Sequence, residues 1–173
     1  MLYARSVRIL AICGSLQANS GNLRLLHSAA SSAPAGVEIQ VFDGLRDLPL
    51  FNPDLESTEA PEAVRAWRAA LASSDAVLIA SPEYGHSLPG AVKNAIDWVI
   101  GSGELESKVV AITAAVPARE RGRLGLQALK QTLGAVNAKV VGGEPIPKGP
   151  SFDAEVAELV QALVTSVARA SQT

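Results

Sequence analysis

Short apolar runs alternate along the chain with longer segments in which apolar residues recur every three or four positions. Five runs have the length and the β-branched content of strands, and the all-apolar ones suit strands that are buried on both faces. These predicted strands cover residues 7–12, 37–42, 76–80, 109–113 and 138–141. Residues 37–42 alternate apolar and polar side chains, which predicts a half-exposed edge strand.

The segments between and after these runs have helical periodicity. This periodicity predicts five helices, at residues 22–32, 62–72, 90–100, 123–133 and 153–170. We expect Leu23, Leu26 and Ala30 to share the buried side of the first helix, and Asp153 to cap the last one. Residues 49–61 are polar and contain three prolines, so a long loop is predicted there.

This strand–helix alternation predicts an α/β fold with a parallel sheet, right-handed crossovers and helices on both faces. Five such units, with the second strand at an edge, fit a flavodoxin-like three-layer sandwich with a five-stranded parallel sheet of order 2-1-3-4-5. With 173 residues and no interdomain linker, we expect one domain over residues 1–173.

Composition narrows the classes of function. A formal net charge of −2 gives no basic footprint for nucleic acid. Cys13 is the single cysteine and there are two histidines, so neither a disulfide framework nor a zinc-type ligand set is expected, and no metal site is predicted. No run reaches the roughly 18 apolar residues of a membrane span. We therefore expect a soluble cytoplasmic protein without nucleic-acid or membrane partners.

The loop after the first predicted strand has the features of a phosphate site. Gly14 ends the strand, and Ser15, Asn19, Ser20 and Asn22 follow just before a helix begins. Free backbone N–H groups and the positive end of a helix dipole favour an anion there. The spacing matches neither Gly-x-Gly-x-x-Gly nor a Walker A loop. The same serine and asparagine residues could instead serve only as helix caps.

A second loop follows the third predicted strand, and the carboxyl end of a strand is where open α/β sheets bind ligands. Pro82-Glu-Tyr-Gly85 ends the strand, and Pro89 and Gly90 open a helix. Val92, Ala95, Ile96 and Val99 then recur at helical spacing, so this face should pack on the sheet.

The stretch from Pro82 to Trp98 resembles the NADPH-dependent FMN reductase family of flavodoxin-like proteins, whose hallmark is Pro-Glu-Tyr-x-x-Ser-x-Pro-Gly-x-x-Lys-Asn-Ala-Ile-Asp-Trp. The segment Leu48-Pro-Leu-Phe-Asn-Pro-Asp54 echoes a second family motif. The family's phosphate turn, Gly-Ser-Leu-Arg-x-x-Ser-x-Asn, is matched at Gly14, Ser15, Leu16, Ser20 and Asn22. Gln17 replaces its arginine, a change that should weaken phosphate binding.

The resemblance implies bound FMN, with NADPH or NADH as co-substrate and a quinone or another small molecule as electron acceptor. It places the FMN phosphate in the first loop and the flavin ring beside the second loop, with a third contact after the fourth strand. The implied cofactor-binding residues are Ser15, Leu16, Gln17, Ser20, Gly21, Asn22, Pro82, Glu83, Tyr84, Gly85, Ala114 and Ala115.

The resemblance also implies a homodimer or homotetramer, and no catalytic side chain, because the cofactor carries the chemistry. Structural alternatives remain open at this stage. Tyr84 and Glu83 could only close or cap the following helix, Lys93 and Asp97 could form an ordinary surface pair, and His86 could be a bystander. A flavodoxin-type electron carrier and a flavin-free binding module are the alternative functions.

The match to the family thins after the fourth predicted strand. Relatives carry a turn rich in Ser and Gly there, whereas residues 113–125 of this chain contain Arg119, Arg121 and Arg123. These arginines could meet the phosphate of NADPH, replace the charge missing at Gln17, or form a solvated basic loop.

Overall fold

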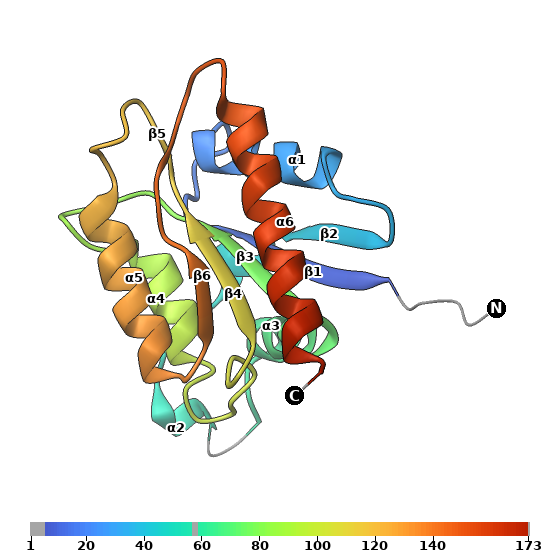
Figure 1. Cartoon of the computed structure of the whole chain (residues 1–173). Coiled ribbons are helices and arrows are strands. Elements are labelled where there is room, and N and C mark those ends of the chain that lie inside the picture. The colour runs from blue at the N-terminus through green and yellow to red at the C-terminus, as the bar shows by residue number, and fades with distance from the viewer. Residues whose placement is uncertain (1–5, 57–58, 173) are drawn as a thin grey trace.

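The computed structural model describes residues 6–56 and 59–172, and its centre is a five-stranded parallel sheet (Figure 1). The strand order is β2-β1-β3-β4-β6, which confirms the flavodoxin-like order expected from the sequence. These strands are β1 (Val7–Cys13), β2 (Val37–Phe42), β3 (Ala76–Ala80), β4 (Val109–Thr113) and β6 (Lys139–Gly142).

Helices cover both faces of the sheet, which completes the three layers (Figure 1). Helices α1 (Gly21–Ser31) and α6 (Phe152–Ala170) pack on one face, and α3 (Glu62–Ser73), α4 (Gly90–Asp97) and α5 (Arg123–Ala135) pack on the other. Neighbouring strand residues serve opposite layers, because side chains alternate along a strand. Val77 and Ile79 contribute to the core beneath α3, α4 and α5, whereas Leu78 contributes to the core beneath α1 and α6.

The strand register brings three loops together at one edge of the sheet. Cys13 pairs with Ala80, and Ala80 pairs with Thr113, so β1, β3 and β4 end level with one another. All the strands are parallel, and the segments that follow these three ends therefore leave the sheet side by side. This edge holds every predicted cofactor-binding residue.

Several local expectations were wrong. Helix α4 ends at Asp97 rather than residue 100, and a short helix, α2 (Pro53–Glu56), interrupts the predicted loop; residues 57–58 of that loop lie outside the described residues. Asp153 does not cap α6. The N-cap is Ser151, and the Asp153 carboxylate accepts a hydrogen bond from the Ser28 hydroxyl on α1 at 2.7 Å.

The buried side of α1 also differs from the expectation. Leu26 is buried as expected, but Leu25 and Ala29 complete the buried face, while Leu23 and Ala30 are half-buried. The helix begins at Gly21, and this face packs against α6 as well as the sheet.

Further short elements appear that the apolar pattern did not predict. They are the 3-10 helix η1 (Gly44–Asp47) and the two-residue strands β5 (Ala115–Val116) and β7 (Ile146–Pro147). Strands β5 and β7 pair in parallel and form a small second sheet beyond the ends of β4 and β6.

Candidate functional site

The first loop forms an amide-lined turn at the start of α1. Ser20 is the N-cap, and its hydroxyl accepts a hydrogen bond from the Leu23 amide at 3.0 Å. The Ser15 hydroxyl accepts a weaker one from the Gln17 amide at 3.3 Å. Within the described chain, the amides of Leu16, Gly21 and Asn22 have no hydrogen-bond acceptor. Such amides at a helix N-terminus are donors for an anion.

Asn22 joins this loop to the segment that follows β4. Its side-chain oxygen accepts a hydrogen bond from the Ala115 amide at 2.9 Å, and the residue is buried. Two of the three predicted cofactor-binding segments are therefore tied together by one side chain. The predicted phosphate contact of Asn22 then falls to its backbone amide.

The first and second loops meet through a close approach at Gly14. A Cβ on Gly14 would lie 2.8 Å from Ser81 Oγ and 3.0 Å from both Ser81 Cα and Val92 Cγ2. No real Cβ tolerates contacts below 3.0 Å without displacement of its neighbours. Glycine is thus required here because the end of β3 packs directly on the end of β1.

The second loop makes a tight hairpin turn that presents Tyr84. The amide and carbonyl of Tyr84 pair with those of Ser87 at 3.0 and 3.1 Å, while Gly85 and His86 have φ angles of +57° and +60°. Positive φ at both central positions defines a type I′ turn. Tyr84 is 56% exposed, so its ring offers a flat surface at this edge of the sheet.

Glu83 fixes the turn to α5, and not to α4, the helix that follows the turn in the sequence. Its carboxylate accepts a hydrogen bond at 2.9 Å from the Gly125 amide, in the first turn of α5, and it therefore caps α5 rather than α4. A Cβ on Gly125 would lie 2.9 Å from Glu83 Cβ and 3.1 Å from Ser87 O. Gly125 lets the helix approach the turn this closely.

The rest of the hallmark motif supports the site from behind. Asn94 accepts a hydrogen bond from the Phe51 amide at 2.8 Å and donates one to Pro49 O at 2.9 Å. Trp98 donates a second one to Pro49 O at 2.7 Å, and its ring meets that of Phe51 edge to face, with centroids 5.1 Å apart. Asn94 and Trp98 therefore hold residues 49–51, which belong to the second family motif, in place.

Lys93 and Asp97, the remaining polar pair of that motif, form a surface ion pair at 2.6 Å. They lie four residues apart on α4, and exposed pairs of this kind contribute little to stability.

The third segment begins with Ala114, which is buried, and Ala115, which is half-buried and pairs with Ile146 of β7. Two of its three arginines, Arg119 and Arg123, pair with carboxylates, whereas Arg121 is exposed and forms no ion pair within the described residues. Arg119 donates two hydrogen bonds of 2.8 Å to Glu155 on α6. These bonds, with one from Ser151, lower the pKa of the Glu155 carboxyl. Arg123 lies 3.6 Å from Glu144.

Lys148 is a residue at this edge that sequence analysis missed. It follows β7 directly, and its side chain reaches Gly21, the first residue of α1. No sequence signal identified it, because the two-residue strands that bring it there have no apolar period of their own.

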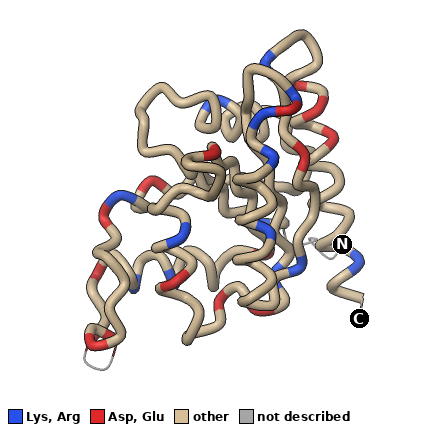
Figure 2. The backbone as a smooth tube through the Cα atoms, turned by 90° about the vertical axis from the view of Figure 1, so that its left-hand side faces the viewer, with Lys and Arg blue, Asp and Glu red and all other residues tan. Residues whose placement is uncertain are grey.

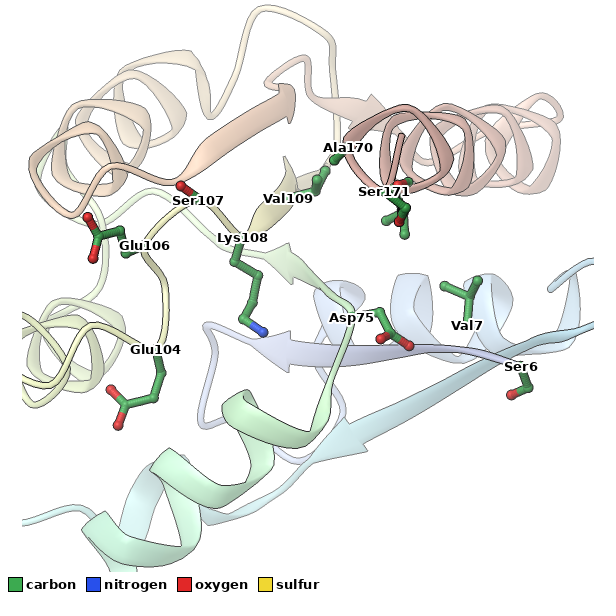
Figure 3. Close-up of a pocket in the computed structure, with 11 residues that line it drawn as sticks. Ser6, Val7, Asp75, Glu104, Glu106, Ser107, Lys108, Val109, Ala170 and Ser171 are labelled. Atoms are coloured by element: carbon green, nitrogen blue, oxygen red, sulfur yellow. Dashed lines mark hydrogen bonds between the residues drawn. The ribbon is translucent and has the colours of Figure 1, made fainter. Parts of the chain in front are cut away.

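A cavity of about 490 Å³ lies at the opposite edge, where the strands begin (Figure 3). Lys108 extends into it from the start of β4, on the side of Asp75 and Glu104. The Lys108 ammonium donates hydrogen bonds to Leu71 O at 2.9 Å and Ser74 O at 2.7 Å, at the end of α3. Burial lowers the pKa of Lys108, and the charges of Asp75 and Glu104 oppose that shift. These contacts make Lys108 a support of the fold.

Charges of both signs are interspersed along the chain (Figure 2). No group of three or more His, Cys, Asp or Glu side chains suited to a metal ion occurs in residues 6–56 or 59–172. Among the helices that the structure describes, none combines the length and the apolar character needed to cross a membrane.

The geometry defines a parallel α/β protein with an amide-lined turn and an exposed tyrosine turn at one sheet edge. The model of the NADPH-dependent FMN reductase family matches residues 7–148, and the chain belongs to this family.

Curated relatives agree with this assignment. An NAD(P)H-dependent FMN reductase of Pseudomonas aeruginosa is 36% identical over 131 residues, which cover 73% of this chain and 69% of that protein. A 2-hydroxy-1,4-benzoquinone reductase of a Burkholderia species is 40% identical over 93 residues, 54% of this chain and 50% of that protein.

Among solved structures, the chain is similar to the flavoenzyme NAD(P)H:(acceptor) oxidoreductase FerB of Paracoccus denitrificans. The TM-score is 0.80 at 27% identity, and the match covers 92% of this chain and 98% of that one. This similarity confirms the flavodoxin-like fold.

Proposed function

We propose that the chain is an NAD(P)H-dependent FMN oxidoreductase that passes reducing equivalents from a nicotinamide to a quinone-like small acceptor. The observation that carries the proposal is the junction of three segments at one edge of the sheet. The amide-lined turn at residues 15–22, the Tyr84 turn and Ala115 are held together by the Asn22–Ala115 hydrogen bond and the Gly14–Ser81 contact.

The residues present fit FMN. The amides of Leu16, Gly21 and Asn22 supply donors for a phosphate, and Ser15 and Ser20 add hydroxyl groups nearby. At the other end, Tyr84 supports a planar ring, and the amides of Gly85 and His86 have no acceptor in the described chain. Amide donors at the first turn and at the Tyr84 turn, with an exposed aromatic ring at the second, match a cofactor with a phosphate tail and a polar ring edge.

FMN, when bound, supplies the hydride chemistry. The chain binds and orients the cofactor, so no side chain has to act as a nucleophile or a general base. The Tyr84–Ser87 pairing fixes the turn, and the Glu83–Gly125 hydrogen bond anchors it on α5. Both contacts keep the donors of the turn in a fixed orientation toward the ring, which is how a protein adjusts the reduction potential of a flavin.

The test combines spectroscopy and kinetics. FMN added to the purified protein should give a perturbed visible absorption spectrum, and the complex should oxidise NADPH or NADH faster when a quinone is present. A complex that holds FMN but oxidises neither nucleotide with any acceptor would instead be an electron carrier. A protein that leaves the FMN spectrum unchanged would be a flavin-free binding module.

We further propose a homodimer or homotetramer. Two large apolar side chains are exposed to solvent: Leu50 is 83% exposed and Ile100 is 56% exposed. Leu50 is exposed even though hydrogen bonds from Asn94 and Trp98 fix the loop that carries it. The oligomer is what the family resemblance implies, and we place its interface at Leu50 because this apolar side chain is exposed on a firmly held loop. Leu50→Asp should therefore shift the mass measured by light scattering toward the monomer, and Leu55→Asp is a control at a less exposed apolar position. An unchanged mass for Leu50→Asp would place the interface elsewhere.

The cofactor contacts are the ones predicted at residues 15–17, 20–22, 82–85 and 114–115. A cytoplasmic location and a preference for NADPH or for NADH are predictions that cell fractionation and steady-state kinetics can test.

A further inference from the structure

Lys148 reaches the predicted phosphate turn from a segment distant in sequence. Its amide donates a hydrogen bond to Val116 O at 2.8 Å, directly after the pairing of Val116 with Pro147 in the β5–β7 sheet. Its side chain ends beside Gly21, since a Cβ on Gly21 would lie 2.7 Å from Lys148 Cε and 2.9 Å from Nζ. The small second sheet thus holds an ammonium group against the first residue of α1.

The surroundings of this ammonium are basic. A cavity of about 460 Å³ lies between Lys148 and the start of α1, and its lining includes Arg24 and His27 but no acidic residue. The first turn of α1 contains no acidic residue either. Within the described residues, no carboxylate pairs with Lys148.

A cation at this position is unfavourable on its own. The N-terminus of a helix carries the positive end of its dipole, which attracts anions and repels ammonium groups. Carboxylates pair with Arg119 and Arg123 on the neighbouring segment, whereas Lys148 lies beside Gly21, the first residue of α1, and has no carboxylate partner among the described residues. A phosphate at the turn would remove this repulsion, because it can accept hydrogen bonds from the helix amides and from the ammonium together.

We propose that Lys148 binds the phosphate of FMN and supplies the positive charge that the family's arginine would supply at Gln17. The inference rests on the proposed function, since it requires FMN in this turn. Of the three arginines considered for this role, Arg119 is held by two hydrogen bonds to Glu155 and Arg123 pairs with Glu144. Arg121 is exposed, and the side chain that lies against Gly21 is that of Lys148. Gln17 itself is exposed and uncharged.

The experiment compares the dissociation constants of FMN and riboflavin, measured by quenching of flavin fluorescence. Lys148→Met should weaken FMN binding about tenfold or more and leave riboflavin within about twofold, because charge-assisted hydrogen bonds to phosphate are lost. Lys148→Arg should stay close to the parent. Lys139→Met is the matched control, because Lys139 is an exposed lysine at the start of β6, on the opposite edge of the sheet.

A second variant relocates the charge. Gln17→Arg in the Lys148→Met background should restore much of the FMN affinity, whereas Gln17→Arg alone should add less because a cation is already present. This rescue separates a lost charge from a damaged fold, since it restores no contact that Lys148 makes with the protein.

Two outcomes overturn the inference and leave the proposed function standing. One is unchanged FMN affinity in Lys148→Met, and the other is an equal loss of FMN and riboflavin, which would mean that Lys148 supports the fold. If the parent protein binds FMN no more tightly than riboflavin, the turn holds no phosphate, and the proposed phosphate site fails together with this inference.

Discussion

Replacing Asn94 with alanine should destabilise the protein more than any single surface change on α4. Asn94 accepts a hydrogen bond from the Phe51 amide and donates one to Pro49 O, at 2.8 and 2.9 Å. Each such bond contributes about 0.5–1.5 kcal/mol, and a donor left without a partner adds to the cost, so we expect a loss of about 2–3 kcal/mol. For a domain of this size, that corresponds to a fall in Tm of about 4–12 °C.

Lys93→Ala is the matched control, one residue earlier in the same helix and in the same hallmark motif. It removes only an exposed ion pair, for which we expect a loss of about 0.3–0.5 kcal/mol. Thermal unfolding followed by circular dichroism, with saturating FMN and without it, gives both values. A fall in Tm for Asn94→Ala no larger than that for Lys93→Ala would refute the argument that Asn94 secures residues 49–51.

Two further predictions concern α5 and the cavity at the opposite edge. Gly125→Ala should destabilise the protein by about 1–3 kcal/mol and weaken FMN binding, because its Cβ would press on Glu83 at 2.9 Å. In the same helix, Gly134→Ala meets no atom within 4 Å and should stabilise by about 0.5–1 kcal/mol, which urea unfolding can resolve. Burial lowers the pKa of Lys108, so the unfolded chain binds more protons between that value and about 10.4. Stability should therefore gain a contribution as pH rises through this interval, and Lys108→Gln should lack it; parallel pH profiles of the two proteins would contradict this.

The central sheet could be predicted because each strand is specified by the apolar pattern of a few consecutive residues. Residues 76–80 and 109–112 are apolar throughout, and the structure buries every one of them, together with Thr113. The half-exposed alternation at residues 37–42 likewise matches the edge position of β2. A strand buried on both faces is apolar throughout, whereas a strand buried on one face alternates apolar and polar residues. Either pattern can be recognised without any knowledge of the rest of the fold.

Other features depend on residues that meet only in the folded chain. The bond from Gly125 to Glu83 spans 42 positions, and no local spacing predicts that Glu83 caps α5 instead of the nearer α4. Strands β5 and β7 have two residues each, too few to show a period. Lys148 follows β7, so its place beside Gly21 was invisible for the same reason.

The family motif could identify the site without separating the roles of its residues. Within the stretch from Pro82 to Trp98, Tyr84 lies exposed at the sheet edge, whereas Asn94 and Trp98 hold residues 49–51. A sequence match treats these positions alike. The structure distinguishes them, because a hydrogen bond to another part of the chain marks a support and an exposed ring marks a surface available to a ligand.

The placement of Lys148 changes how phosphate binding would couple to the rest of the site. An arginine at position 17 would act from within the first turn, so that turn alone would hold the phosphate. Lys148 instead belongs to a segment fixed to β5 by the Val116 carbonyl, and Ala115 of β5 is bonded to Asn22 of the turn. The Asn22–Ala115 hydrogen bond already joins the first and third segments. A phosphate bound by both the first turn and Lys148 would add a second connection between them. The departure from the family at Gln17 and the altered segment after β4 would then be connected, because that segment includes Val116, whose carbonyl accepts the hydrogen bond from the Lys148 amide.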